Sequence, residues 1–256
     1  MGTFEHDTRV ERTADDTFSC DIDPTWWVIA GPNGGYLAAI AVRALQSRFD
    51  TTERPLRSLT LQYLRAPEPG PAEVEVVPER EGRSVTFARL RLIQDGRPCA
   101  LGMAVLARSG DSIELDTAVA PKAPPPESVE PMPVVEQTPP FAGHFDFRPV
   151  LSPAPGEALA GGWLRLREDH ELDAPLVTAL CDSWFPAIFS VAHRPMAVPT
   201  LDLTVYLRRP LPRPGDWVLG RYTTRLAGEG LLEEDAELFT PDGLLLAQSR
   251  QLALAR

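Results

Sequence analysis

The sequence predicts an α+β protein built from two copies of one unit, in which an antiparallel sheet wraps around a central helix. Three observations support this fold class. Short sequences recur in one order in both halves, a proline-rich segment separates the halves, and each half contains an apolar helical segment followed by strand-like runs. The length of 256 residues is sufficient for two domains of ordinary size.

The recurring sequences keep a nearly constant offset. The pairs are Tyr63-Leu64-Arg65 with Tyr206-Leu207-Arg208, Glu81-Gly82 with Glu229-Gly230, and Asp95-Gly96 with Asp242-Gly243, at offsets of 143, 148 and 147 residues. Each match is short, but three matches in the same order indicate an internal duplication.

A proline-rich segment lies between the two copies. Eight of the residues from 121 to 140 are proline, and proline cannot donate to a helix or sheet ladder, so this segment predicts an extended linker. We expect an N-terminal domain over residues 1–110, a linker over 111–142 and a C-terminal domain over 143–256.

The first copy begins with the helix. Leu37, Ile40, Ala41 and Ala44 follow the i, i+3, i+4, i+7 spacing of a helix with one buried face, within residues 34–45. The expected strands are 56–65, 72–79, 84–94 and 98–107, with a leading strand near 18–22.

The second copy has the same order of elements. We expect a helix over residues 175–190, with Pro175 in its first turn and Pro186 kinking or ending it. The expected strands are 200–208, 215–225, 231–239 and 243–253, with a leading strand near 163–167. One long helix followed by an antiparallel meander, used twice, is the plan of a tandem (double) hot-dog fold.

Composition excludes several classes of function. The formal charge of −11 disfavours nucleic-acid binding, and the single lysine, Lys122, stands in no Walker-type motif. Cys20, Cys99 and Cys181 form no CxxC pair, and the four histidines have no metal-ligand spacing, so we predict no metal and no cofactor. The N-terminus has no apolar signal segment, and we expect a cytoplasmic protein without a membrane span.

Several motifs, in order and spacing, resemble the acyl-CoA thioesterase II (TesB-like) family of double hot-dog enzymes. In the first half these are the segments 32–39 (PNGGYLAA), 61–65 (LQYLR), 82–84 (GRS) and 94–97 (QDGR). In the second half they are Asp182, the strand start Thr200-Leu201-Asp202, and Gln251. The resemblance covers nearly the whole chain outside the linker, and it implies hydrolysis of acyl-CoA thioesters.

The same resemblance implies a catalytic group of Asp182, Thr200 and Gln251, which are the positions matching the residues that hold a catalytic water in that family. A carboxylate can take a proton from water, while a hydroxyl and an amide fix its remaining hydrogen and lone pair. Each residue type also has an ordinary structural explanation, because threonine and glutamine are common in strands.

The two helices carry complementary parts of one motif. Many hot-dog thioesterases have Gly-Gly at the helix start and an acid seven residues later. The first helix keeps Gly34-Gly35 but has Val42 at the seventh position, whereas the second has Ala174-Pro175 and keeps Asp182. We therefore hypothesise one composite site, with the glycine turn from the first half and the acid from the second. Backbone N–H groups at the glycine turn are expected to stabilise an oxyanion.

Further residues are candidates for binding the substrate. They are Asn33, Gly34, Gly35, Tyr36, Arg83 and Trp184. Arg83 is one of several arginines that could contact coenzyme A phosphates, and the aromatic residues could line an acyl tunnel or belong to the core. Acyl-CoA or an acyl carrier protein thioester is the expected partner, and a homodimer or higher homo-oligomer is the expected assembly.

Two alternatives remain open from the sequence. One is a hot-dog hydratase or dehydratase, which usually pairs histidine with an acid. The other is a catalytically silent acyl-CoA or carrier-protein binder.

Overall fold

The computed structural model describes residues 3–133, 135–136 and 138–256. The central helix of the first half is α2 (Gly34–Arg48), preceded by the short helix α1 (Phe4–Asp7). The strands of this half are β1 (Glu11–Ala14), β2 (Thr17–Ile22), β3 (Leu56–Tyr63), β4 (Gly70–Glu81), β5 (Val85–Gln94) and β6 (Arg97–Ala107).

The second half repeats this order around a shorter helix, α3 (Ala174–Leu180). A 3-10 turn, η4 (Ala187–Ser190), follows it. The strands are β7 (Phe145–Pro149), β8 (Ala158–Leu166), β9 (Thr200–Leu207), β10 (Val218–Thr224), β11 (Ala227–Gly228), β12 (Leu231–Phe239) and β13 (Leu245–Leu254).

All the strands join one antiparallel sheet that is continuous across the two halves. Its order is β1-β2-β4-β5-β6-β3-β9-β13-β12-β10-β8-β7, with β11 paired to β12. The halves meet where β3 pairs with β9, and the Thr60 and Thr204 hydroxyls lie 3.0 Å apart there. The strand order on one side of this junction mirrors the order on the other, as the duplication predicts. The result is the double hot-dog arrangement.

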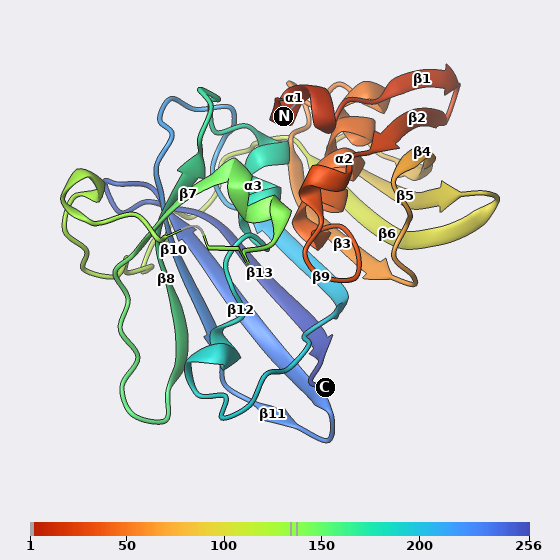
Figure 1. The fold of residues 1–256 in the computed structure, drawn as a ribbon. Helices are drawn as coiled ribbons and strands as arrows, with labels where there is room; N and C mark the ends of the chain where they lie inside the picture. The colour runs from red at the N-terminus through yellow and green to blue at the C-terminus, as the bar shows by residue number, and fades with distance from the viewer. Residues whose placement is uncertain (1–2, 134, 137) are drawn as a thin grey trace.

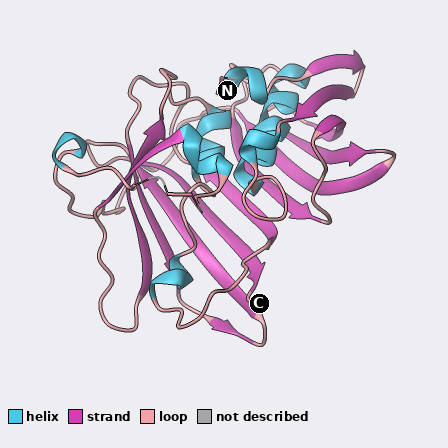
Figure 2. Ribbon diagram, viewed as in Figure 1, coloured by secondary structure: helices cyan, strands magenta, loops and turns pink. Residues whose placement is uncertain are grey.

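The helices α2 and α3 lie on the same face of this sheet and against each other (Figure 1). Figure 2 shows helices gathered over the sheet, whose strands curve around them. One core cluster of buried apolar side chains runs through both halves, from Phe18 and Ile40 to Leu180 and Leu246. Because α2 and α3 share this core, each helix start can approach the other helix's end. Among the described helices, none is long and apolar enough to cross a membrane.

The proline-rich stretch is extended but packed. Residues 108–125 contain no helix or strand, and Ala118, Ala120 and Ala123 cover a second cluster that includes Trp163 and Trp217. The indole N–H of Trp163 donates to the carbonyl oxygen of Pro124 at 2.8 Å. The stretch therefore shields apolar surface that would otherwise face solvent. The domain boundaries stay a prediction from the sequence.

The second helix is shorter than the predicted 175–190. It ends at Leu180, so Asp182 lies in the turn that follows. Other elements take up the terminal carbonyl oxygens: Ser183 Oγ donates to Ala179 O at 2.7 Å, and Tyr222 OH donates to Leu180 O at 2.6 Å. These contacts satisfy the groups that a longer helix would have paired, and Pro186 caps the following 3-10 turn instead of kinking a helix.

The strands were predicted more closely than the helices. Each expected run overlaps an observed strand, and their ends differ by a few residues at most, except that β8 begins at Ala158, well before the expected start at residue 163. The helix α2 continues to Arg48, beyond the predicted end at residue 45. The sequence prediction missed the short α1, β1, β7 and β11, which carry too few residues for a clear periodic pattern.

Candidate active site

The start of α2 faces the turn that follows α3. Asn33 is the N-cap of α2, and its Oδ1 accepts from the Tyr36 amide at 2.9 Å. Its Nδ2 donates to the main-chain oxygen of Asp182 at 2.7 Å. Asn33 therefore starts its own helix and also fixes the turn from the other half, which brings the two parts of the motif together.

Gly34 and Gly35 allow this close approach. The Gly35 amide donates to Asp182 Oδ2 at 2.9 Å. A Cβ atom at Gly34 would lie 2.8 Å from Asp182 Oδ2, and one at Gly35 would lie 2.5 Å from the main-chain oxygen of Ala179. Any side chain at either position would push the acid or the neighbouring helix away, so glycine is required by contact distance.

The carboxyl of Asp182 is easier to protonate than an ordinary aspartate. Burial raises its pKa from the usual 3.8 to about 6, and hydrogen bonds from the Gly35 amide, the Gln251 side chain and the Gly34 amide oppose this rise. The residue nevertheless keeps part of its surface accessible. A carboxyl with a pKa near neutrality is suited to accepting and returning a proton.

Thr200 and Gln251 lie beside this acid on two paired strands. Thr200, at the start of β9, donates from Oγ1 to Gln251 Oε1 at 2.7 Å. Gln251, on β13, points its Nε2 toward Glu234 Oε1 at 3.1 Å. The three residues expected from the family resemblance are thus connected, since Gln251 also contributes to the pKa of Asp182.

Two further residues belong to this group although they were not among the predicted site residues. The Tyr63 hydroxyl donates to Gly34 O at 2.7 Å, and burial, with Asp182 and Asp202 nearby, raises its pKa well above 10. Glu234 is only 3% exposed. The sequence contained a signal for it: Leu232, Ala236 and Leu238 alternate on the inward face of β12, and Glu234 is the charged member of that row.

The structure does not bring every predicted residue to this place. Tyr36 is fully buried, its ring stacks on Trp26, and its hydroxyl donates to the main-chain oxygens of Asp7 and Asp21. Its position is that of a core residue, because helix periodicity directs it away from the Asp182 turn. It therefore offers no surface to a substrate.

Trp184 and Arg83 each have surroundings other than the group around Asp182. Trp184 follows the Asp182 turn but packs edge-on against Phe147, with ring centroids 5.2 Å apart. Arg83 is exposed in the β4–β5 turn. There, β5 pairs with the end of β6 that neighbours the start of β3, whereas Tyr63 is at the far end of β3. The register thus separates Arg83 from the catalytic candidates by the length of a strand.

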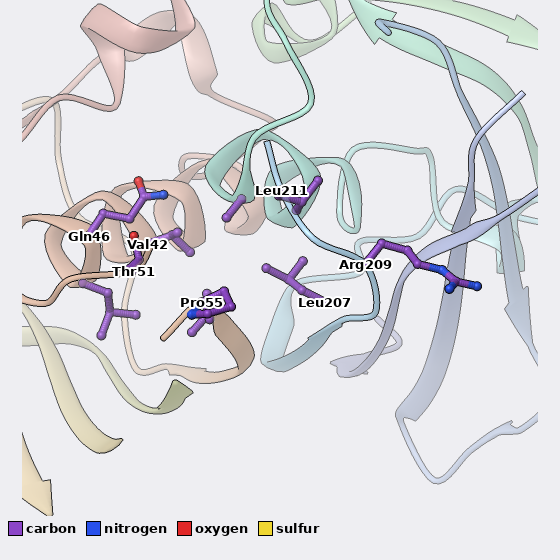
Figure 3. Close-up of a pocket in the computed structure, with 10 residues that line it drawn as sticks. Val42, Gln46, Thr51, Pro55, Leu207, Arg209 and Leu211 are labelled. Atoms are coloured by element: carbon purple, nitrogen blue, oxygen red, sulfur yellow. The ribbon is translucent and has the colours of Figure 1, made fainter. Parts of the chain in front are cut away.

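The start of α3 and the C-terminal half of α2 form the second place where a helix start meets a helix end, and its residues differ from those around Asp182. A pocket there is lined by Val42 and Gln46 of α2, by Ala174 at the start of α3, and by Leu207 and Arg209 near the end of β9 (Figure 3). No carboxylate is among the described residues that line it. The duplication therefore produced two such places. At Gly34 the acid Asp182 lies at the helix end and bonds to the glycine turn, whereas at the start of α3 the N-cap Asp173 is paired with Arg43 of α2.

The described residues include no cluster of three or more His, Cys, Asp or Glu side chains arranged to hold a metal ion. Two of the histidines have partners other than Asp182. The ring of His144 stacks on Trp26 at 3.8 Å, and His170 lies 3.3 Å from Asp173.

Comparison with known proteins gives a consistent result for both halves. Residues 23–107 match the family "Acyl-CoA thioesterase N-terminal domain", and residues 121–255 match "Acyl-CoA thioesterase C-terminal domain". An uncharacterized protein of Mycobacterium tuberculosis is 29% identical over 93% of this chain and 90% of its own length.

Solved structures share the whole fold. A hot-dog protein of unknown function from Alicyclobacillus acidocaldarius superposes with a TM-score of 0.92 at 25% identity, covering 100% of this chain and 98% of the other. A putative thioesterase II from Thermobifida fusca gives a TM-score of 0.86 at 25% identity, covering 99% of each chain. The acyl-CoA thioesterase II TesB2 of Mycobacterium marinum gives 0.79 at 22% identity, covering 99% and 98%.

Proposed function

Since the chain belongs to the acyl-CoA thioesterase family through both of its halves, we propose that it hydrolyses acyl-CoA thioesters at one composite site. The observation that carries this proposal is the 2.9 Å hydrogen bond from the Gly35 amide to Asp182 Oδ2. It joins the glycine turn of one half to the acid of the other.

In the proposed reaction, a water molecule attacks the thioester carbonyl carbon and Asp182 takes the proton that the water releases. The tetrahedral intermediate then collapses, the C–S bond breaks, and the proton on Asp182 passes to the leaving thiolate. The products are a carboxylic acid and free coenzyme A. Thr200 and Gln251 orient the water, because their linked side chains lie beside the acid.

The start of α2 stabilises negative charge at this place. The Gly35 amide already donates to Asp182. In the resting enzyme it therefore positions the acid, and it is not a free donor for the oxyanion. The positive end of the 15-residue helix then acts on both anions in turn, first the carboxylate and then the oxyanion.

Release of free thiol from a panel of acyl-CoAs tests the function. We expect turnover with at least one acyl-CoA, and kcat should fall as the pH drops through about 6, because the raised pKa of Asp182 makes its carboxylate form scarce below that value. Tight binding of the panel without thiol release would instead favour a silent binding protein. The same panel, with carrier-protein thioesters added, identifies the thiol carrier and the acyl preference.

Thr200 offers a second test, because its role depends on the hydroxyl. Thr200→Val removes the donor to Gln251 Oε1 while keeping the branched shape. We expect kcat to fall about tenfold, which corresponds to the loss of one hydrogen bond of about 1.4 kcal/mol. Thr200→Ser keeps the hydroxyl and should retain most of the activity. Equal activity of both variants would remove Thr200 from the mechanism.

The hydratase alternative is not favoured by the geometry. His144 and His170 pack against Trp26 and Asp173 respectively, and neither belongs to the group around Asp182. We also propose a cytoplasmic homo-oligomer without a resident cofactor. Sedimentation of the purified protein tests the oligomeric state, and analysis of its metal content tests for a bound metal.

A further inference from the structure

Glu234 is a buried carboxylate with an unusual set of partners. Its Oε2 accepts from the Ala187 amide at 2.5 Å, and its Oε1 accepts from Gln251 Nε2 at 3.1 Å. Among the described residues it forms no ion pair with an arginine or histidine. Burying a carboxylate is costly unless hydrogen bonds or an ion pair compensate for the lost hydration, so the two hydrogen bonds of Glu234 are what hold its charge there.

An ionised carboxylate only accepts hydrogen bonds, and this fixes the orientation of Gln251. The amide must present its NH2 group to Glu234, which leaves Oε1 to face Thr200. Thr200 therefore donates its proton to Gln251 at 2.7 Å, and its oxygen lone pairs stay free to accept a hydrogen bond from water. Glu234, the carboxylate to which Gln251 Nε2 donates at 3.1 Å, sets the direction of these hydrogen bonds together with Asp182, which the Gln251 side chain also contacts.

We propose that Glu234 is a positioning residue that locks the side-chain amide of Gln251 in this orientation, and that only ionised Glu234 does so. This inference rests on the proposed thioester hydrolysis and adds a residue to its site. Protonated Glu234 can donate to Gln251 Oε1, so the amide is free to turn over, and Thr200 then faces an NH2 group to which it cannot donate.

The surroundings of Glu234 place its ionisation near neutrality. Burial raises its pKa to about 7, the Ala187 amide lowers it, and the negative charge of Asp182 raises it further. The other titratable groups nearby are Tyr222 on β10, whose pKa lies well above 10, and Asp235 on the outward face of β12, which is paired with Arg250. Tyr222 stays protonated between pH 6 and 8, and the raised pKa values of Asp182 and Glu234 place their ionisation in this range.

The test is a double-mutant comparison of kcat and its pH dependence. In Glu234→Gln the side chain keeps one acceptor oxygen, whereas both the Ala187 amide and Gln251 Nε2 need an acceptor. The amide of Gln251 therefore loses its fixed direction. We expect kcat to fall about tenfold with little change in KM. In the Gln251→Ala background the same substitution should have no further effect, because Glu234 acts through Gln251.

The pH profile separates positioning from a general structural role. In the wild type, kcat should fall steeply below pH 7, since two carboxylates become protonated, whereas Glu234→Gln should show one ionisation. Glu233→Gln, the matched change on the outward face of the same strand, should leave the profile unaltered. Additive losses in the double variant, or an unchanged number of ionisations, would overturn the inference.

A readout that does not need turnover keeps this result distinct from failure of the proposed function. The side-chain amide NMR signals of Gln251, identified by their absence in Gln251→Ala, should shift with a midpoint near pH 7. In Glu234→Gln this step should disappear, and only the shift caused by Asp182, near pH 6, should remain. If the wild type releases no thiol, the hydrolysis proposal fails. The Gln251 titration still decides whether Glu234 controls the amide. A Gln251 amide signal that does not change with pH would overturn the proposed role of Glu234.

Discussion

Asp182→Asn should lower thioester turnover by about 10²- to 10⁴-fold, the contribution of a positioned general base, and should unfold at a higher temperature than the wild type at pH 8. The loss of activity follows because asparagine cannot accept the proton from water. Asparagine keeps an oxygen for the Gly35 amide, so the turn should hold its shape and an acyl-CoA should still bind.

The gain in stability follows from the sign of the pKa shift. The pKa of Asp182 is raised from the usual 3.8 to about 6 in the folded protein, so the folded state holds the proton more tightly than the unfolded state. The stabilisation from this group is present below about pH 4 and is lost as the pH rises toward 6. At pH 8 the wild type carries the cost of a buried charge, which we place at about 1–2 kcal/mol because the residue is partly accessible.

Thermal unfolding at pH 4 and pH 8, together with kcat at pH 8, measures both effects. The variant should match the wild type at pH 4 and exceed it by a few degrees at pH 8. Asp169→Asn, an exposed acid between β8 and α3, is the matched control and should change neither property. Wild-type turnover in the Asp182→Asn variant would remove Asp182 as the base.

Alanine at either glycine should be the second most damaging change. At Gly35, a Cβ would lie 2.5 Å from the Ala179 oxygen and 3.1 Å from its Cα, so two helices must separate. We expect a stability loss of about 1–3 kcal/mol and at least 10²-fold lower kcat. At Gly34 the Cβ would instead meet the ends of Asp182 and Tyr63, at 2.8 and 3.2 Å. We expect there a similar loss of kcat with a smaller loss of stability.

Kinetics and denaturant titration of the two variants check this difference. Gly228→Ala is the control, since a Cβ there meets nothing within 4 Å, and it should behave like the wild type. If Gly34→Ala and Gly35→Ala both keep full activity, the contact between the glycine turn and the acid is not needed for turnover.

The sequence was sufficient for the duplicated fold because periodicity and turn signals act locally. The strands were found from alternation, and α2 from the spacing of Leu37 and Ile40. The end of α3 could not be found this way, because it is set by Ser183 and Tyr222, the latter from a strand distant in sequence. The helix-start motif located Gly35 and Asp182 within one site, since the two halves supply complementary parts.

Other parts of the site depend on tertiary contacts. Tyr36 follows the glycines directly but faces the core, because successive helix residues point in different directions. Glu234 was overlooked although it interrupts an apolar row on β12. Its importance is visible only when Gln251 is placed beside it by strand pairing, and such pairing is not readable from a single sequence.

The central claim is that Asp182 activates a water molecule that attacks the thioester. A single turnover in ¹⁸O-labelled water tests it most directly, with mass spectrometry of the released acid and of the peptide that contains Asp182. We predict one ¹⁸O atom in the acid and none in the peptide. Label in Asp182 together with an unlabelled acid would show that its carboxylate attacks the substrate itself, and would contradict the claim.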